Sequence, residues 1–166
     1  MTAHPAGTIL LIDNEPSFVR ALARLLQRDG YRVDTAAEGQ QALVQLQTQH
    51  YDVILCDLWM PGLDGRAFYT RLQQQAPALC ARVIFITGDT LGAESTAFLA
   101  QCGRPVLTKP CPAAAIRHAI QQVLGTEAAI WHRGAKQEPI NTYKISPAPQ
   151  FLVCCQLGKD RLTEFL

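Results

Sequence analysis

The chain alternates short apolar runs with longer segments of helical periodicity, and this alternation restricts the possible folds more than any other feature. Ile9–Ile12 is a continuous apolar run, as expected for a strand buried on both faces of a parallel sheet. After Pro16, apolar residues recur every three or four positions, which indicates a helix ending near Gly30. The same pair of patterns recurs up to residue 125. It predicts an α/β fold with a parallel sheet and helices on both faces.

Five strands and five helices are expected in all. The expected strands are Ile9–Ile12, Tyr31–Ala36, Val53–Cys56, Val83–Ile86 and Val106–Leu107. The first expected helix follows Pro16, the second contains Ala42, Leu43 and Leu46 and ends near His50, and the third contains Phe68 and Leu72 and ends by Pro77. The fourth runs from Ala93 to Gln101, before Gly103, and the fifth runs from Ala113 to Leu124, with Gly125 as the stop. Right-handed crossovers leave few topologies. We expect a doubly wound, flavodoxin-like sheet of strand order 2-1-3-4-5, an order taken from known sheets of this class.

Composition is consistent with a single domain and excludes several classes of protein. The chain has 166 residues, 48% of them hydrophobic, and a net charge of +1, so nothing in its charge suggests nucleic-acid binding. It contains neither an apolar run long enough for a membrane-spanning helix nor the pattern of a signal peptide. The six cysteines form no C-x-x-C pair. We therefore expect a cytoplasmic protein with free thiols and no membrane insertion.

The pattern changes after residue 125. Residues 126–166 contain three prolines, two apolar spots and no further strand–helix unit. This predicts a domain at residues 8–125 and a C-terminal extension at residues 126–166. The extension is expected to be a partly disordered linker, or to dock a short terminal helix on the domain. It is too short and insufficiently basic for a DNA-binding effector.

Polar side chains gather where the expected strands end. Asp13 and Asn14 follow the first strand, and Asp57 follows the third. Thr87 follows the fourth strand and Lys109 the fifth. In open parallel sheets, ligands bind beyond the carboxyl ends of the strands, where the strand order reverses. The expected order therefore places Asp13, Asn14 and Asp57 in one crevice.

This set of residues suits one kind of chemistry. Crowded carboxylates must either bind a cation or raise their pKa values, because like charges repel at short range. Oxygen ligands without His or Cys nearby favour a hard ion such as Mg²⁺. An aspartate can also attack a phosphoryl group to form an aspartyl phosphate. Lys109 would supply a positive charge for that transfer, and Thr87 a hydrogen bond. Each residue alone has an ordinary explanation as a helix cap, a strand residue or a solvated cation, but together they predict a phosphoryl-acceptor site.

Four motifs occur in order at the ends of these strands. They are Ile9-Leu10-Leu11-Ile12-Asp13-Asn14-Glu15-Pro16, Asp57-Leu58-Trp59-Met60-Pro61-Gly62-Leu63-Asp64-Gly65, Ile86-Thr87-Gly88 and Leu107-Thr108-Lys109-Pro110. In sequence, order and spacing, residues 8–124 resemble the receiver domain of two-component response regulators. The stretch from Thr87 to Leu107 is similar to receivers attached to hybrid sensor kinases.

The resemblance implies a phosphorylation cycle at Asp57. The phosphoryl group would come from a histidine kinase or a histidine phosphotransfer protein. Mg²⁺ would be bound by Asp13, Asn14, Asp57 and the backbone carbonyl of Trp59. Such a domain catalyses its own phosphoryl transfer and autodephosphorylation, but does not turn over a small substrate.

The resemblance also implies how the phosphorylated state is read. Thr87 and Lys109 would contact the phosphoryl group, and the Lys109–Pro110 bond would be cis, as is common in the family. Phosphorylation would shift a two-state equilibrium and change the surface formed by the fourth helix, fifth strand and fifth helix. A downstream protein would bind there.

The sequence departs from the family pattern in three respects. Asn14 stands where a second acidic residue is usual, so we expect weaker Mg²⁺ binding. Val106 stands where a Tyr or Phe often acts as an aromatic switch with Thr87. Trp59 and Asp89 lie two residues after Asp57 and Thr87 respectively, beside the path of hydrolytic water in the family. We hypothesise that Trp59 shields the phosphoryl group, although it could merely cover the loop.

Other functions fit the sequence less well. The main alternative is a pseudo-receiver, a protein-interaction module that is not phosphorylated; Asn14 and Val106 favour it, whereas the presence of Asp57, Thr87 and Lys109 opposes it. A haloacid-dehalogenase-like hydrolase would need an acidic residue two positions after its nucleophile. A flavodoxin-like cofactor binder would need a phosphate-binding loop after the first strand.

Overall fold

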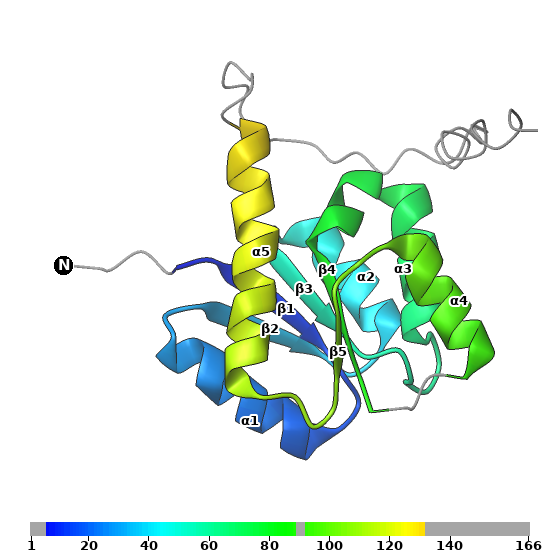
Figure 1. Cartoon of the computed structure of the whole chain (residues 1–166), viewed down its shortest axis with the longest axis horizontal. Helices are drawn as coiled ribbons and strands as arrows, with labels where there is room; N and C mark the ends of the chain where they lie inside the picture. Colours follow the sequence, from blue (N-terminus) through cyan, green and yellow to red (C-terminus); the bar gives the residue numbers. More distant parts are fainter. Residues whose placement is uncertain (1–5, 89–91, 132–166) are drawn as a thin grey trace, which may run out of the picture.

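A computed structural model describes residues 6–88 and 92–131, which form a single five-stranded parallel sheet (Figure 1). The strands are β1 (Thr8–Ile12), β2 (Arg32–Ala36), β3 (Val53–Cys56), β4 (Val83–Thr87) and β5 (Val106–Thr108). The helices are α1 (Pro16–Arg28), α2 (Gly39–Thr48), α3 (Gly65–Gln75), α4 (Ala93–Cys102) and α5 (Ala113–Trp131), with a 3₁₀ helix η1 (Pro77–Arg82). The strand order is β2-β1-β3-β4-β5, which confirms the predicted topology.

The helices cover both faces of the sheet because alternate strand residues point in opposite directions. Leu10 and Ile12 of β1 belong to the core cluster beneath α2, α3 and α4, whereas Ile9 and Leu11 belong to the cluster beneath α1 and α5. All four side chains are essentially inaccessible to solvent. Burial on both faces explains why the central strands are continuous apolar runs in the sequence.

Local sequence signals account for several helix ends. Pro16 begins α1, where its missing N–H costs no hydrogen bond. Asp64 caps α3, and its side chain accepts a hydrogen bond from the backbone N–H of Ala67 at 2.8 Å. Gly103 ends α4 in the left-handed conformation, at φ 60°. The start of α1 and the end of α4 lie close to their predicted positions.

The C-terminal boundary of the last helix was predicted wrongly. Gly125 was expected to stop it, but α5 runs through Gly125 to Trp131. A glycine inside a helix costs about 1 kcal/mol relative to alanine, and Ile116, Ile120 and Val123 pack this helix onto the sheet and support its continuation. The predicted extension therefore begins as helix over residues 126–131, and the rest of it lies outside the described residues.

Two further findings concern η1 and the cysteines. The 3₁₀ helix η1 was not predicted, since Pro77 was interpreted only as the end of the preceding helix. The four described cysteines are free thiols, as expected; they are Cys56, Cys80, Cys102 and Cys111. None of the described helices is both long enough and apolar enough to cross a membrane.

Candidate functional site

Two aspartates lie side by side beyond the carboxyl ends of β1 and β3. The strands are neighbours, with Ile12 opposite Cys56, so Asp13 and Asp57 follow at the same edge of the sheet. Their backbones continue the ladder: Asp13 N–H donates to Ala36 O at 3.0 Å, and Asp57 N–H donates to Ile12 O at 2.9 Å. Both residues are buried. Backbone hydrogen bonding thus fixes the two aspartates at the carboxyl edge of the sheet, as predicted.

Lys109 bridges these two carboxylates. Its Nζ donates to Oδ2 of Asp13 at 2.6 Å and to Oδ2 of Asp57 at 2.7 Å. Burial lowers the pKa of Lys109, but the hydrogen bonds and negative charges of Asp13 and Asp57 outweigh this effect, so the pKa is raised overall. The structure therefore brings three of the predicted site residues into direct contact, with the lysine charged.

The second oxygen of each carboxylate is also held. Oδ1 of Asp13 accepts a hydrogen bond from the backbone N–H of Glu15 at 2.8 Å. Oδ1 of Asp57 accepts one from the backbone N–H of Trp59 at 3.0 Å. Backbone donors of this kind leave no sequence signal, because any residue except proline supplies them. They restrict how each carboxylate can rotate.

Thr87 and Lys109 are brought together by β4 and β5. Thr87 is the last residue of β4, is fully buried and pairs in register with Thr108. The backbone N–H of Lys109 donates to Thr87 O at 2.7 Å. The peptide bond between Lys109 and Pro110 is cis, as the resemblance implied.

The remaining predicted positions lie around this centre. Asn14 is exposed beside Asp13. The side chain of Trp59 is half-exposed, and Cζ of Arg66 lies 5.5 Å from the centre of its ring. Val106 is partly buried against the core. Because the residue is a valine, there is no aromatic ring at this position. Asp89 lies outside the described residues.

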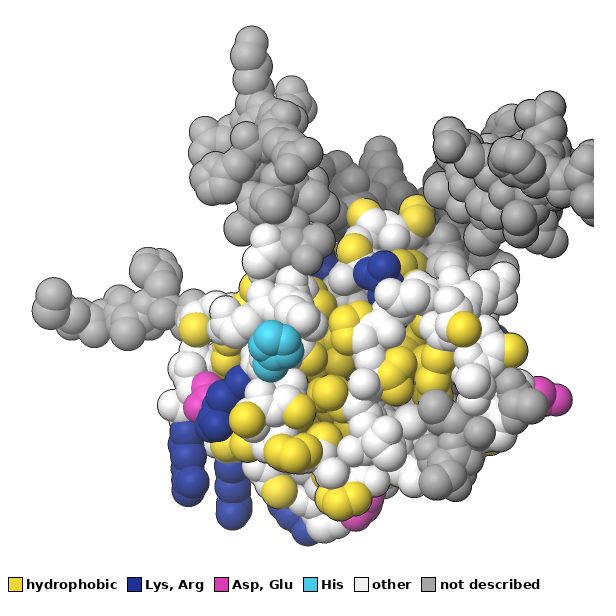
Figure 2. Space-filling view, in the orientation of Figure 1, with side chains coloured by type: hydrophobic (Ala, Val, Ile, Leu, Met, Phe, Trp, Pro, Cys, Tyr) yellow, Lys and Arg dark blue, Asp and Glu magenta, His cyan; other side chains and the backbone are white. Residues whose placement is uncertain are grey.

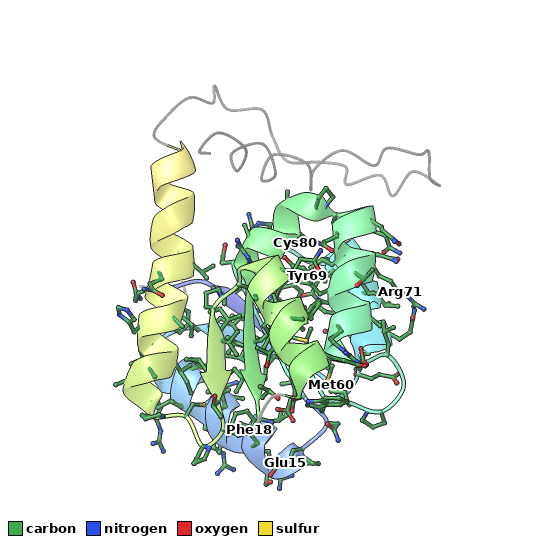
Figure 3. All side chains as sticks on the ribbon, turned by 45° about the vertical axis from the view of Figure 1, so that its right-hand side comes forward. Glu15, Phe18, Met60, Tyr69, Arg71 and Cys80 are labelled. Atoms are coloured by element: carbon green, nitrogen blue, oxygen red, sulfur yellow. The ribbon has the colours of Figure 1, made fainter. Side chains whose placement is uncertain are left out.

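Two residues near the site were not singled out from the sequence. The ring of Phe18 lies 4.3 Å from Lys109 Nζ, but its spacing in α1 had indicated only a core position. Gly65 begins α3 directly against the backbone of Asp57, so that a Cβ atom would overlap the Asp57 carbonyl oxygen. The sequence signal for Gly65 was a glycine within a turn motif, but that signal does not show that the Asp57 carbonyl oxygen lies so close to it. Figure 3 shows Glu15, Phe18 and Met60 near the end of the sheet where the site lies.

The donor set suits a hard divalent cation. Two carboxylates and one ammonium leave a formal charge of −1 among buried groups, and each carboxylate oxygen has spare lone pairs. Among the described residues, no three His, Cys, Asp or Glu side chains converge as a metal cluster. An ion here would therefore rely on the two aspartates together with neutral oxygens. Mg²⁺ is bound in this way, by one or two carboxylates with carbonyls, waters and phosphate.

Comparison with known proteins identifies the family. The sequence model of the response regulator receiver domain matches residues 9–121, which is more than half of the chain. The chain belongs to this family. It is a receiver domain of two-component signal transduction, and receiver domains of this family bind Mg²⁺ in their active sites and interact with histidine kinases and downstream effectors.

The relatives include both response regulators and sensor kinases. The receiver is 32% identical over 102 residues to the transcriptional regulatory protein TcrA of Mycobacterium tuberculosis, a match covering 61% of this chain and 40% of the relative. It is 39% identical over 72 residues to the sensor protein EvgS of Escherichia coli K12, covering 43% of this chain and 6% of the relative. The receiver thus spans less than half the length of these relatives.

Solved structures of receivers share the fold. The signal receiver domain of a histidine kinase from Syntrophus aciditrophicus superposes with a TM-score of 0.69 at 26% identity, covering 83% of this chain and 99% of that one. The receiver domain of a sensor histidine kinase from Pseudomonas aeruginosa PAO1 gives a TM-score of 0.65 at 29% identity, covering 72% and 98%. That structure is described with a magnesium ion coordinated in its active-site cleft.

Proposed function

We propose that Asp57 accepts a phosphoryl group and that the receiver thereby acts as a switch in a phosphorelay. The observation that carries the proposal is the contact of 2.7 Å between the buried Asp57 carboxylate and Lys109 Nζ. An Asp57 oxygen attacks the phosphorus of a phosphohistidine, the new P–O bond forms as the P–N bond breaks, and the electron pair stays on the imidazole nitrogen. The ammonium of Lys109 stabilises the negative charge on the transferring oxygens.

Mg²⁺ fits the same crevice. The residues that would hold it are Asp13, Asn14, Asp57 and the backbone carbonyl of Trp59. When bound, the ion neutralises charge on the phosphoryl oxygens and orients them for in-line attack. The support for this assignment is the uncompensated negative charge of the aspartate pair.

Thr87 and Lys109 connect phosphorylation to a change of surface. Thr87 ends β4 and Lys109 directly follows β5, and the backbone hydrogen bond between them couples their positions. Contacts with the phosphoryl group would favour one arrangement of the loops that follow β4 and β5. Figure 2 shows hydrophobic side chains on the face between α4 and α5, where Phe98, Val106 and Leu107 are partly buried. We assign the downstream partner to this face.

The phosphoryl donor would be a histidine kinase or a phosphotransfer protein that approaches beside α1. Arg20, Arg24 and Arg28 recur every four residues, so they share one side of α1. All three are exposed, and none forms an ion pair with any residue of the described ranges. The helix begins three residues after Asp13. An acidic surface on the donor would complement this side.

Binding to nucleic acid is not part of this proposal, and a cytoplasmic location remains a prediction.

Phosphorylation from a small donor tests the proposal directly. The full chain is incubated with acetyl phosphate and Mg²⁺, and its intact mass is measured. We expect a gain of one phosphoryl group in the wild type, and no gain in Asp57→Ala or without Mg²⁺. Asp52→Ala is the matched control, because Asp52 lies at the opposite end of β3, and it should be phosphorylated.

A pseudo-receiver is the second candidate, and the same experiment separates it. Asn14 and Val106 are the observations that favour it, since each lacks a group that is common in the family. A wild-type chain that gains no mass, but is folded, would support a phosphorylation-independent interaction module.

A further inference from the structure

The ring of Phe18 is the third group in contact with the ammonium of Lys109. Nζ lies 4.3 Å from the ring centre, within the distance at which the negative face of an aromatic ring attracts a cation. An ammonium has three N–H donors, and the carboxylates of Asp13 and Asp57 accept from two of them. Phe18 belongs to the first turn of α1 (Figure 3). Lys109 follows β5, so this contact joins two separate elements at the site.

We propose that Phe18 is a positioning residue for Lys109 during phosphoryl transfer. Its ring would hold the ammonium in place while the hydrogen bonds of Lys109 pass from the Asp57 carboxylate to the phosphoryl group. The proposal rests on the phosphoryl transfer proposed above for Asp57.

The contribution of the ring grows as the reaction proceeds. In the resting state two carboxylates hold Lys109, so the ring adds little to its position. As an Asp57 oxygen bonds to phosphorus, negative charge moves from the carboxylate to the phosphoryl oxygens, and the carboxylate attracts the ammonium less. An aromatic face attracts a cation that lies over it within about 6 Å of the ring centre. Nζ, at 4.3 Å, can therefore shift toward the phosphoryl oxygens and stay in contact with Phe18. An interaction that matters more in the transition state than in the ground state accelerates the reaction.

Packing alone does not explain an aromatic residue at this position. Phe18 is partly buried against the core cluster beneath α1 and α5, and Leu or Met would also fill such a place. Only an aromatic side chain offers a π face to Nζ. Packing and the contact with Lys109 predict different results when the shape of the ring is kept and the negative charge of its face is reduced. Packing predicts no change in the rate, whereas the contact with Lys109 predicts a slower reaction.

The test varies the ring at position 18 and measures the rate of phosphorylation by acetyl phosphate with Mg²⁺. Trifluorophenylalanine, introduced by nonsense suppression, keeps the shape of the ring but withdraws electron density from its face. We expect this variant and Phe18→Leu to be roughly three- to tenfold slower than the wild type, the range of a partly desolvated cation–π contact. Phe18→Tyr, which keeps the π face, should stay within about twofold of the wild type.

The controls separate positioning from stability and from the proposed function itself. Leu46→Ala removes apolar packing on α2, beneath the other face of the sheet, and should keep the wild-type rate. A loss of rate in Leu46→Ala as large as in Phe18→Leu would assign the effect to packing and overturn the proposal. A trifluorophenylalanine variant as fast as the wild type would overturn the role of Phe18 alone. A wild-type chain that gains no phosphoryl group would overturn the proposed function as well.

Discussion

Lys109 Nζ lies 2.7 Å from Oδ2 of Asp57, although 52 residues separate the two in the chain. The same ammonium is bonded to Asp13, so a single positive charge offsets two buried negative charges. The arrangement that suits phosphoryl transfer therefore also destabilises the fold, because the buried negative charge exceeds the positive charge. In the absence of another cation, the stability of this end of the sheet depends on Lys109.

Replacing Lys109 by methionine should destabilise the receiver. Removal of one partner of a buried ionic group leaves uncompensated charge, and the expected loss in the free energy of unfolding is about 3–5 kcal/mol. Added Mg²⁺ should restore part of this loss in the variant, because it would bind Asp13 and Asp57 and neutralise their charge. Urea unfolding of wild type and Lys109→Met, with and without Mg²⁺, measures both effects.

The matched control for this change is Arg117→Met. Arg117 forms an ion pair with Asp29 at 2.7 Å on the surface, where solvent screens the interaction. Its loss should change stability far less and should not respond to Mg²⁺. Equal destabilisation of the two variants would contradict the view that the Lys109 site is electrostatically special.

Gly65→Ala should disturb the acceptor loop. A Cβ atom at this position would overlap the Asp57 carbonyl oxygen and lie 2.9 Å from Cα of Leu58, and both are backbone atoms that cannot rotate away. We expect a loss of about 1–3 kcal/mol of stability, as in other overpacked positions, together with slower phosphorylation of Asp57. Gly125→Ala is the control, because nothing lies within 4 Å of its Cβ position. In the middle of α5 it should raise stability by about 0.5–1 kcal/mol; stabilisation by both substitutions would refute the close-contact argument.

The sequence predicted the sheet well because its central strands β1, β3 and β4 are buried on both faces. In Val53–Cys56 every side chain is inaccessible, so the apolar run had no competing interpretation. The end of α5 was missed because a single glycine is a weak stop signal when the helix is packed onto the sheet. The 3₁₀ helix η1 was missed because a proline is typical both after the end of a helix and at the first position of one. Pro77 was interpreted only as the end of the preceding helix, whereas it also begins η1.

The candidate site was predictable to the extent that strand order determines it. Once β1 and β3 are neighbours, Asp13 and Asp57 must follow them at the same edge of the sheet. The bridge formed by Lys109 depends on side-chain reach, and the contact with Phe18 depends on the angle at which α1 leaves the sheet. Neither quantity is encoded in the spacing of apolar residues, so both required the structure.

The receiver should lose stability at alkaline pH, partly through Tyr51. Burial, followed by the hydrogen bond to Asp34 and its charge, raises the pKa of Tyr51 to about 12, whereas an unfolded tyrosine titrates near pH 10. The folded state thus retains the proton more strongly, so this contribution to stability is complete below about pH 10 and is lost as pH rises toward 12. Tyr51→Phe should flatten the fall in unfolding free energy above about pH 9. Urea unfolding over this range measures the slope, and parallel slopes in variant and wild type would argue against the assignment.

Trp59→Asn should shorten the lifetime of the phosphorylated state. The indole is half-exposed two residues beyond Asp57, and Arg66 packs over its ring, so it covers one side of the loop that carries the acceptor. A smaller polar side chain would admit water toward the phosphoryl group. The decay of the phosphoprotein, after the donor is removed, gives the lifetime. Val44→Asn, at the exposed apolar position of α2, should not change it. An unchanged lifetime in Trp59→Asn would leave the indole with no role beyond covering the loop.

Asn14→Asp should tighten the binding of Mg²⁺, since it adds a negative charge next to Asp13. A further carboxylate ligand strengthens the binding of a hard divalent ion, and we expect a dissociation constant lower by about tenfold, or about 1.4 kcal/mol. The same charge should destabilise the metal-free protein, because a third carboxylate joins a site with a single ammonium. Titration of Mg²⁺ followed by tryptophan fluorescence measures the affinity.

Glu15→Gln distinguishes direct ligation at position 14 from a general effect of charge. Glu15 is exposed and accepts a hydrogen bond from the hydroxyl of Ser17, 2.9 Å away, so its carboxylate is turned to its own helix. Its removal should change the Mg²⁺ affinity by less than about twofold, because solvent screens an exposed charge. If Asn14→Asp and Glu15→Gln shifted the affinity by equal and opposite amounts, the charge of the loop as a whole would set Mg²⁺ affinity, and Asn14 would not be a ligand. A shift confined to Asn14→Asp would place the side chain at position 14 on the ion and would support the expectation that Asn14 weakens Mg²⁺ binding.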